Sequence, residues 1–107
     1  MSLDIYIINK QNETVWDYNI THNLNKMAKQ AGLYEALWRP EEYELNTTDS
    51  IVELLEDGLN NLKERPDYFK KFNPSNGWGN YEGLVRFVEE YIEACKDNPK
   101  CRILAHR

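Results

Sequence analysis

The chain has 107 residues, of which 41% are hydrophobic and 29% are charged, and its formal net charge is −5 with a pI near 5.0. This composition is that of one ordinary globular domain. The acidity argues against a protein that coats nucleic acid, which needs a basic surface to displace counterions, and it disfavours an anionic membrane surface. A cationic protein surface or a small ligand remains open as a partner.

The lack of a membrane span or signal peptide in the sequence, together with the small number of cysteines, predicts the cellular compartment. No apolar run approaches the roughly 18 residues of a membrane span, and the first eight residues lack the basic region and long apolar core of a signal peptide. Two cysteines, Cys95 and Cys101, are too few for a disulfide scaffold. We therefore expect a cytoplasmic protein in which both thiols are reduced, although a bridge between them is geometrically conceivable.

The N-terminal part of the chain predicts a β-hairpin. Residues 3–9 are rich in β-branched and aromatic side chains, which is typical of a strand, and both of its faces are partly apolar, as in a central strand. Residues 14–20 predict a second strand with Trp16, Tyr18 and Ile20 on one face. A short polar turn separates the two stretches, so they should pair in an antiparallel arrangement.

A helix is predicted directly after the second strand. Thr21 is a suitable N-cap for a helix over 22–31, and Gly32 is the expected residue just past its end. Residues 33–37 predict one more helical turn. That turn should end before Pro40, because the residue preceding a proline is pushed away from helical geometry.

A long amphipathic helix follows a polar connector at 41–49. The spacing of Ser50 and Glu53 predicts a capping box at its start, and the apolar positions continue at helical spacing to Glu64. Pro66 should end this helix.

The last helix is predicted from the most regular apolar pattern in the chain. Residues 67–72 predict a further helical turn, and the segment 73–80 is a turn rich in glycine and asparagine. Asn80 is the expected N-cap of a helix that starts near Tyr81 and ends before Pro99.

These elements predict the fold. Residues 101–106 read as a third strand, which gives the order strand, strand, three to four helices, strand. We expect a single α+β domain over 1–107, with a three-stranded antiparallel or mixed sheet in the order 2-1-3 and the helices packed on one face. Strand three should run antiparallel to strand one, and the helices should form a right-handed crossover from strand two to strand three.

This topology suggests a ligand site at one end of the sheet. The ends of strands two and three would bring Thr21, His22 and Asn23 close to His106. A helix start offers free N–H groups and a partial positive charge to an anion, and His22 titrates near neutral pH. The alternative interpretation is that Thr21 only caps the helix while His22 packs on the sheet or is solvated.

Two loops carry large aromatic side chains and form the second group of candidate binding residues. They are Trp38 with Arg39, and Asn76 with Trp78 and Asn80. Tryptophan and arginine dominate binding energy at many interfaces, and polar loop residues beside them suit a ligand pocket. The alternative is that each tryptophan simply fills the end of the core.

The sequence contains no recognisable catalytic set. There is no glycine-rich phosphate loop, no Ser-His-Asp set and no Cys-His nucleophile pattern. His22, His106, Cys95 and Cys101 are metal-ligand types, but their spacing matches no zinc clip. We therefore predict no catalytic residues, no metal and no cofactor.

Three segments together resemble a group of small conserved bacterial and phage-borne proteins of unknown function. They are NITHNLNKMA at 19–28, YEALWRPEE at 34–42 and NPSNGWGNYEGLV at 73–85. The likeness extends from the first strand through the last helix. It implies a prophage or accessory gene product and transfers no functional residues to this chain.

Three functional hypotheses follow. The first is a small acidic, non-enzymatic binding protein of phage or mobile-element type that binds a host protein or a small ligand. The second is a small enzyme or sequestering protein that acts on an anionic, nucleotide-like ligand at Thr21–Asn23. The third is a homodimer through the exposed edge of strand two, where Trp16 and Tyr18 would support association.

Overall fold

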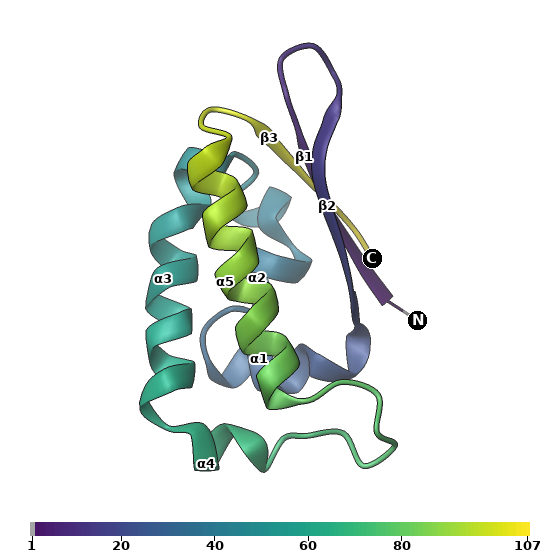
Figure 1. Ribbon diagram of the computed structural model, residues 1–107, viewed down its shortest axis with the longest axis vertical. Coiled ribbons are helices and arrows are strands. Elements are labelled where there is room, and N and C mark those ends of the chain that lie inside the picture. The colour runs from purple at the N-terminus through teal and green to yellow at the C-terminus, as the bar shows by residue number, and fades with distance from the viewer. Residues whose placement is uncertain (1) are drawn as a thin grey trace.

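A three-stranded antiparallel sheet forms one layer of the protein. The computed structural model describes residues 2–107. Strand β1 (Ser2–Ile8) lies between β2 (Thr14–Thr21) and β3 (Arg102–His106), and both neighbours run antiparallel to it (Figure 1). The predicted strand order 2-1-3 is confirmed. Thr21 pairs with Ser2 and His106 pairs with Asp4, so the ends of β2 and β3 do meet at one end of the sheet.

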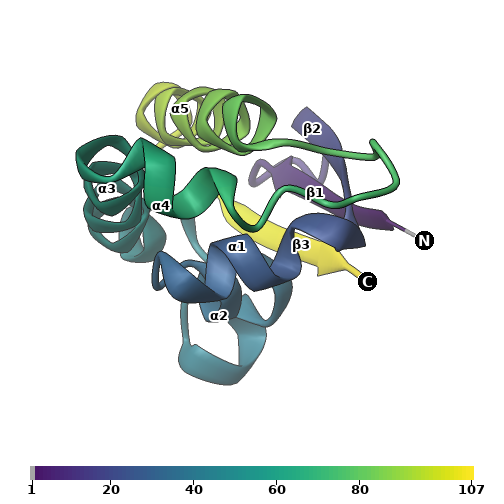
Figure 2. The same ribbon diagram turned by 90° about the horizontal axis from the view of Figure 1, so that it is seen from below.

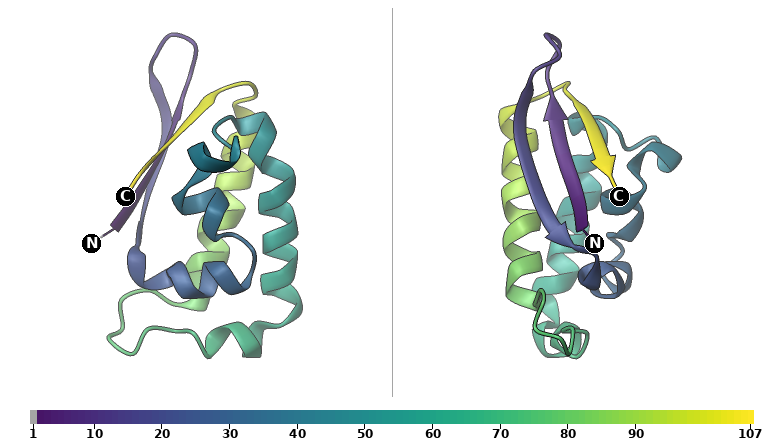
Figure 3. Two further views of the ribbon diagram at one scale, coloured as in Figure 1. Left: turned by 180° about the vertical axis from the view of Figure 1, so that it is seen from behind. Right: turned by 90° about the vertical axis from the view of Figure 1, so that its right-hand side faces the viewer.

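The helices form the second layer and cover a single face of the sheet (Figures 2 and 3). Two long helices pack side by side, and the short helical segments lie beside them and at their ends (Figures 1 and 2). In chain order the segments are η1 (His22–Leu24), α1 (Asn25–Gln30), α2 (Tyr34–Trp38), η2 (Pro40–Tyr43), α3 (Thr48–Glu64), α4 (Pro66–Lys70) and α5 (Tyr81–Asp97).

The core lies between these two layers. Leu3, Ile5 and Ile7 of β1 are fully buried, while the alternate residues of the strand face the uncovered side of the sheet and are only partly buried. Burial alternates from one residue to the next because successive side chains of a pleated β-strand point to opposite faces of the sheet. Within residues 2–107, no helix has both the length and the apolar character needed to cross a bilayer.

The capping box of α3 lies earlier than predicted. Thr47 is the N-cap: its Oγ1 accepts from the Ser50 N–H at 3.2 Å, and the Ser50 hydroxyl accepts from the Thr47 N–H at 3.3 Å. The predicted box of Ser50 and Glu53 is therefore wrong. The run Thr-Thr-Asp-Ser offers several capping side chains, and tertiary pairing selects among them because Thr47 also forms a β-bridge with Arg102.

Other predicted boundaries differ from the structure in detail. The helix predicted over 22–31 is a turn of 3₁₀-helix, η1, followed by the short α1. The polar connector predicted at 41–49 overlaps η2, which starts at Pro40, and the first two residues of α3, Thr48 and Asp49. Pro66 does end α3, but it also starts α4, since proline lacks an N–H and the first position of a helix does not use one.

Two asparagines fix the start of α5. The side chain of Asn80 accepts from the Gly83 N–H at 2.7 Å, which confirms it as the N-cap, and Asn73 accepts from the Tyr81 N–H at 2.8 Å. The Tyr81 hydroxyl donates to the Leu62 carbonyl at 2.7 Å and thereby ties α5 to the end of α3.

A glycine sets the distance between α3 and the segment before α2, and its replacement tests that packing. A Cβ on Gly58 would lie 2.3 Å from Leu33 Cδ2 and 2.4 Å from Leu33 Cγ, and Leu33 is itself fully buried. We expect Gly58→Ala to destabilise the protein by about 1 to 2 kcal/mol, because overpacking outweighs the roughly 1 kcal/mol gain in helix propensity. Urea unfolding measures this, with the exposed Asn60→Ala as the control. A Gly58→Ala variant as stable as the parent would contradict the packing.

Candidate functional site

The loop at 71–80, between α4 and α5, lies against the junction of β2 and η1 (Figure 2). Asn23 Nδ2 donates to Asn76 Oδ1 at 3.4 Å across this contact. Gly79, at φ +92°, comes so close that a Cβ on it would lie 2.7 Å from Thr21 Cγ2 and 3.0 Å from Leu24 Cγ. Two of the predicted candidate segments, Thr21–Asn23 and Asn76–Asn80, therefore do meet in space.

The same loop holds Trp78 out in solvent. Asn76 Oδ1 also accepts from the Trp78 N–H at 3.0 Å, and Gly77 takes a positive φ of 79° that closes the turn. The Trp78 side chain is 70% exposed, so it does not fill the end of the core. A large aromatic side chain on a loop with internal hydrogen bonds is an unusual surface feature, since exposure leaves its apolar area in water.

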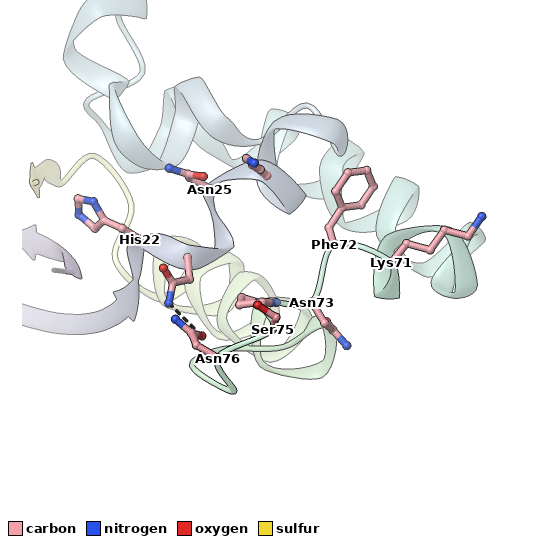
Figure 4. A pocket seen from close by; sticks show the side chains of 10 residues that line it. His22, Asn25, Lys71, Phe72, Asn73, Ser75 and Asn76 are labelled. Atoms are coloured by element: carbon pink, nitrogen blue, oxygen red, sulfur yellow. Dashed lines mark hydrogen bonds between the residues drawn. The ribbon is translucent and has the colours of Figure 1, made fainter.

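Two hollows flank the Asn23–Asn76 contact, and we call them together the loop cleft. One, of about 580 Å³, lies between the start of α1 and the loop (Figure 4). The other, of about 720 Å³, extends toward the N-terminal end of β1 and includes Trp78. Both are lined by His22, Asn23 and Asn76, so they adjoin.

The lining of the loop cleft is cationic and amide-rich. Lys26 and Lys71 belong to it, neither forms an ion pair with any other residue of 2–107, and no aspartate or glutamate lines either hollow. Lys71 stands at the end of the cleft opposite His22, on an exposed part of the loop, and its side chain extends outward, away from Ser75 and Asn76 (Figure 4). In a protein of net charge −5, this is a local reversal of charge.

His22 borders both hollows, and its imidazole points away from the loop (Figure 4). Figure 4 shows its imidazole turned away from Ser75 and Asn76. The ring instead meets the Trp38 indole edge-on, with centroids 6.1 Å apart, and His22 Nε2 is buried without a hydrogen-bond partner among the described residues. Thr21 Oγ1 accepts from the Asn23 N–H at 3.2 Å as the cap of η1, and the ring contact of His22 is with Trp38 of α2.

Trp38 and Arg39 lie outside the cleft. Trp38 is 2% exposed and stacks on Tyr34 with ring centroids 5.6 Å apart. Arg39 donates to the Tyr34 hydroxyl at 3.2 Å and forms an ion pair with Glu42 at 2.7 Å. These two predicted binding residues therefore serve the packing and surface of α2 and η2, and Asn80 serves as a helix cap, so only part of the predicted set converges.

Some cleft residues were absent from the prediction. Lys26, Lys71 and Ser75 line it although sequence reasoning did not single them out. Lys26 lies four residues after His22, and this spacing on a helix was an available signal. Nothing local indicated Lys71, because its place in the lining depends on how the loop returns to η1.

The other candidates for chemistry are metal-ligating clusters and the two cysteines. Among residues 2–107, no group of three or more histidine, cysteine, aspartate or glutamate side chains is arranged to hold a metal ion. Cys95 and Cys101 are buried free thiols. Burial raises the pKa of Cys95 to about 12, so it stays protonated and unreactive at neutral pH.

Comparisons with known proteins add no functional assignment. No family model, no curated protein and no solved structure matches the chain.

Proposed function

We propose that this protein is a non-enzymatic binding protein that holds a small anionic ligand in the loop cleft. The observation that carries the proposal is the lining: two lysines without ion-pair partners and no carboxylate, in a protein that is otherwise acidic. A bound anion would compensate Lys26 and Lys71, and the amides of Asn23 and Asn76 would supply neutral donors.

Trp78 supports a ligand that also carries a flat ring. Its exposed indole borders the second hollow and offers an apolar face beside the cationic part of the cleft. Stacking of a planar ring on an aromatic side chain contributes roughly 1 to 3 kcal/mol in nucleic-acid complexes. A ligand with a ring at one end and a phosphate or carboxylate at the other, such as a nucleotide, satisfies both parts.

Binding is favoured over catalysis because the cleft offers no acid–base group in a working position. The one imidazole in its lining, His22, is turned toward Trp38. General acid–base catalysis needs a titratable group within hydrogen-bond reach of the reacting atoms.

Calorimetry and thermal shift with AMP, adenosine and inorganic phosphate test the proposal. AMP is expected to stabilise the protein most, because it alone combines ring and anion, and the stabilisation follows mass action. Lys26→Gln with Lys71→Gln should weaken AMP binding about tenfold, which corresponds to two partly exposed charge contacts. The control combines Lys10→Gln and Lys100→Gln. These two lysines lie outside the cleft and form no ion pair with the described residues, so removing the same amount of charge there should leave the affinity for AMP unchanged.

Trp78→Ala distinguishes the contribution of the ligand's ring to affinity from that of its phosphate. It should weaken AMP about tenfold and leave the response to phosphate unaltered, because only the ring would contact the indole. The proposal fails if AMP and phosphate at millimolar concentration give no stabilisation, or if adenosine binds as well as AMP.

A further inference from the structure

One edge of the sheet is open. β2 pairs only with β1, and among residues 2–107 no backbone hydrogen bond joins the other edge of β2 to another segment. The opposite edge of the sheet is protected: Ile103 N–H donates to the Asn46 carbonyl at 2.8 Å, and Thr47 bridges to Arg102. β2 therefore presents a row of unsatisfied N–H and C=O groups, which is a template for another strand.

A groove runs beside this open edge. It lies between the first half of β2 and the second half of α5, holds about 380 Å³, and has Val15 and Trp16 on the strand side. Figure 3 shows α5 next to β2 and behind it. Trp16 is half-buried and stacks on Tyr91 at 5.2 Å between ring centroids, so the apolar floor of the groove is fixed by the core.

The helix side of the groove carries uncompensated negative charge. Glu90, Glu93 and Asp97 line it, and none of them forms an ion pair with the described residues. Glu82 and Glu89, the other two glutamates of the same side of α5, instead pair with lysines of α4 and α3. The three acids of α5 without ion pairs are thus those that line the groove, and Arg86, one turn before Glu90, is the nearest cation of the helix and lies outside the lining.

We propose that the β2 edge binds an extended, cationic segment of a partner protein as a fourth strand. Backbone hydrogen bonds to β2 would give the register, and every second side chain would face α5. Glu90 to Asp97 spans about 10 Å along the helix, and alternate residues of a strand are about 6.7 Å apart, so two alternating lysines or arginines match the acidic row.

The charge pattern selects this occupant over a second copy of the chain. Pairing of two β2 edges would bring together two grooves that are each lined by three carboxylates and only one nearby arginine, Arg86, and the excess of like charge costs stability. The lysines or arginines of a cationic strand would instead be attracted to the carboxylates of Glu90, Glu93 and Asp97. The surface is separate from the loop cleft, so this inference stands or falls independently of the proposed ligand.

NMR titration of the whole chain with a nine-residue peptide of alternating lysine and valine tests the inference. The β2 amides at 14–20 should shift, and affinity should fall as salt rises because the contacts are ionic. The same peptide with N-methylated alternate amides should lose at least tenfold in affinity, since it cannot pair with the edge. Equal binding of the methylated peptide, or shifts confined to α5, would show simple electrostatic adsorption and overturn the inference.

Matched charge variants complete the test. Glu90→Gln, Glu93→Gln and Asp97→Asn together should weaken the peptide about tenfold. The control combines Glu53→Gln, Asp57→Asn and Glu64→Gln, three exposed α3 residues without ion pairs, and should leave the affinity unchanged. Equal weakening in both variants, or a homodimer of the parent chain that hides the β2 amides, would refute the proposed partner.

Discussion

Trp38→Ala is expected to lower the free energy of unfolding by about 3 to 5 kcal/mol, the usual range for removing a buried aromatic side chain. Trp38 is 2% exposed, stacks on Tyr34 and meets His22 edge-on. Its loss would leave a large cavity at the point where α2 approaches the end of the sheet, and close-packed neighbours can fill such a cavity only in part. Urea unfolding followed by circular dichroism gives the difference.

Trp78→Ala is the control, because it deletes the same side chain from a position that is 70% exposed. Its stability should stay within about 0.5 kcal/mol of the parent. A Trp38→Ala variant that loses less than Trp78→Ala would contradict the assignment of Trp38 to the core and Trp78 to the surface.

Thr48→Val is expected to cost about 2 to 4 kcal/mol although it preserves shape. Thr48 is fully buried, and its Oγ1 donates to the Asn98 carbonyl at 2.7 Å and accepts from the Cys101 N–H at 3.0 Å. Valine would fill the same space and leave the buried Cys101 N–H and the part-buried Asn98 carbonyl without this partner, and each such group costs about 1 to 3 kcal/mol. Denaturant unfolding measures the loss, and amide exchange should show β3 opening first.

Thr48→Ser retains the hydroxyl and removes only a methyl group, so it should cost about 1 kcal/mol. If serine and valine destabilise the protein equally, the hydrogen bonds of Thr48 do not hold β3 and the methyl group accounts for the effect.

The first two strands of the sheet were predictable because the residue patterns that identify and pair them lie within short stretches of the sequence. The alternation of apolar side chains in β1 identifies a strand, and a short polar turn leaves β2 no other neighbour. Both faces of β1 are partly apolar, which is typical of a central strand, so the third strand was predicted to pair with the free edge of β1. The start of α3 was predicted incorrectly because Thr47 and Ser50 are both good capping residues, and the choice depends on pairing with Arg102 about fifty residues away.

The candidate site was only partly predictable for the same reason. Trp38 and Trp78 occupy similar polar loops in the sequence, yet one is buried and the other exposed. Burial of Trp38 depends on segments distant in the chain, including Arg107, whose Nη1 donates to the Trp38 carbonyl at 2.6 Å. The pairing of Lys26 with Lys71 in one cleft likewise arises from a tertiary approach that no local pattern encodes.

The position of β3 has a consequence for biosynthesis. Asp4 pairs with His106, so β1 cannot complete its pairing until nearly the whole segment has been made. At roughly 5 to 20 residues per second, this interval is about 5 to 20 s. A two-stranded hairpin alone is marginally stable, and during this time the apolar face with Leu3, Ile5 and Ile7 lacks its full cover. The newly made chain thus passes through a period of exposure to aggregation that ends only when β3 emerges and pairs with β1.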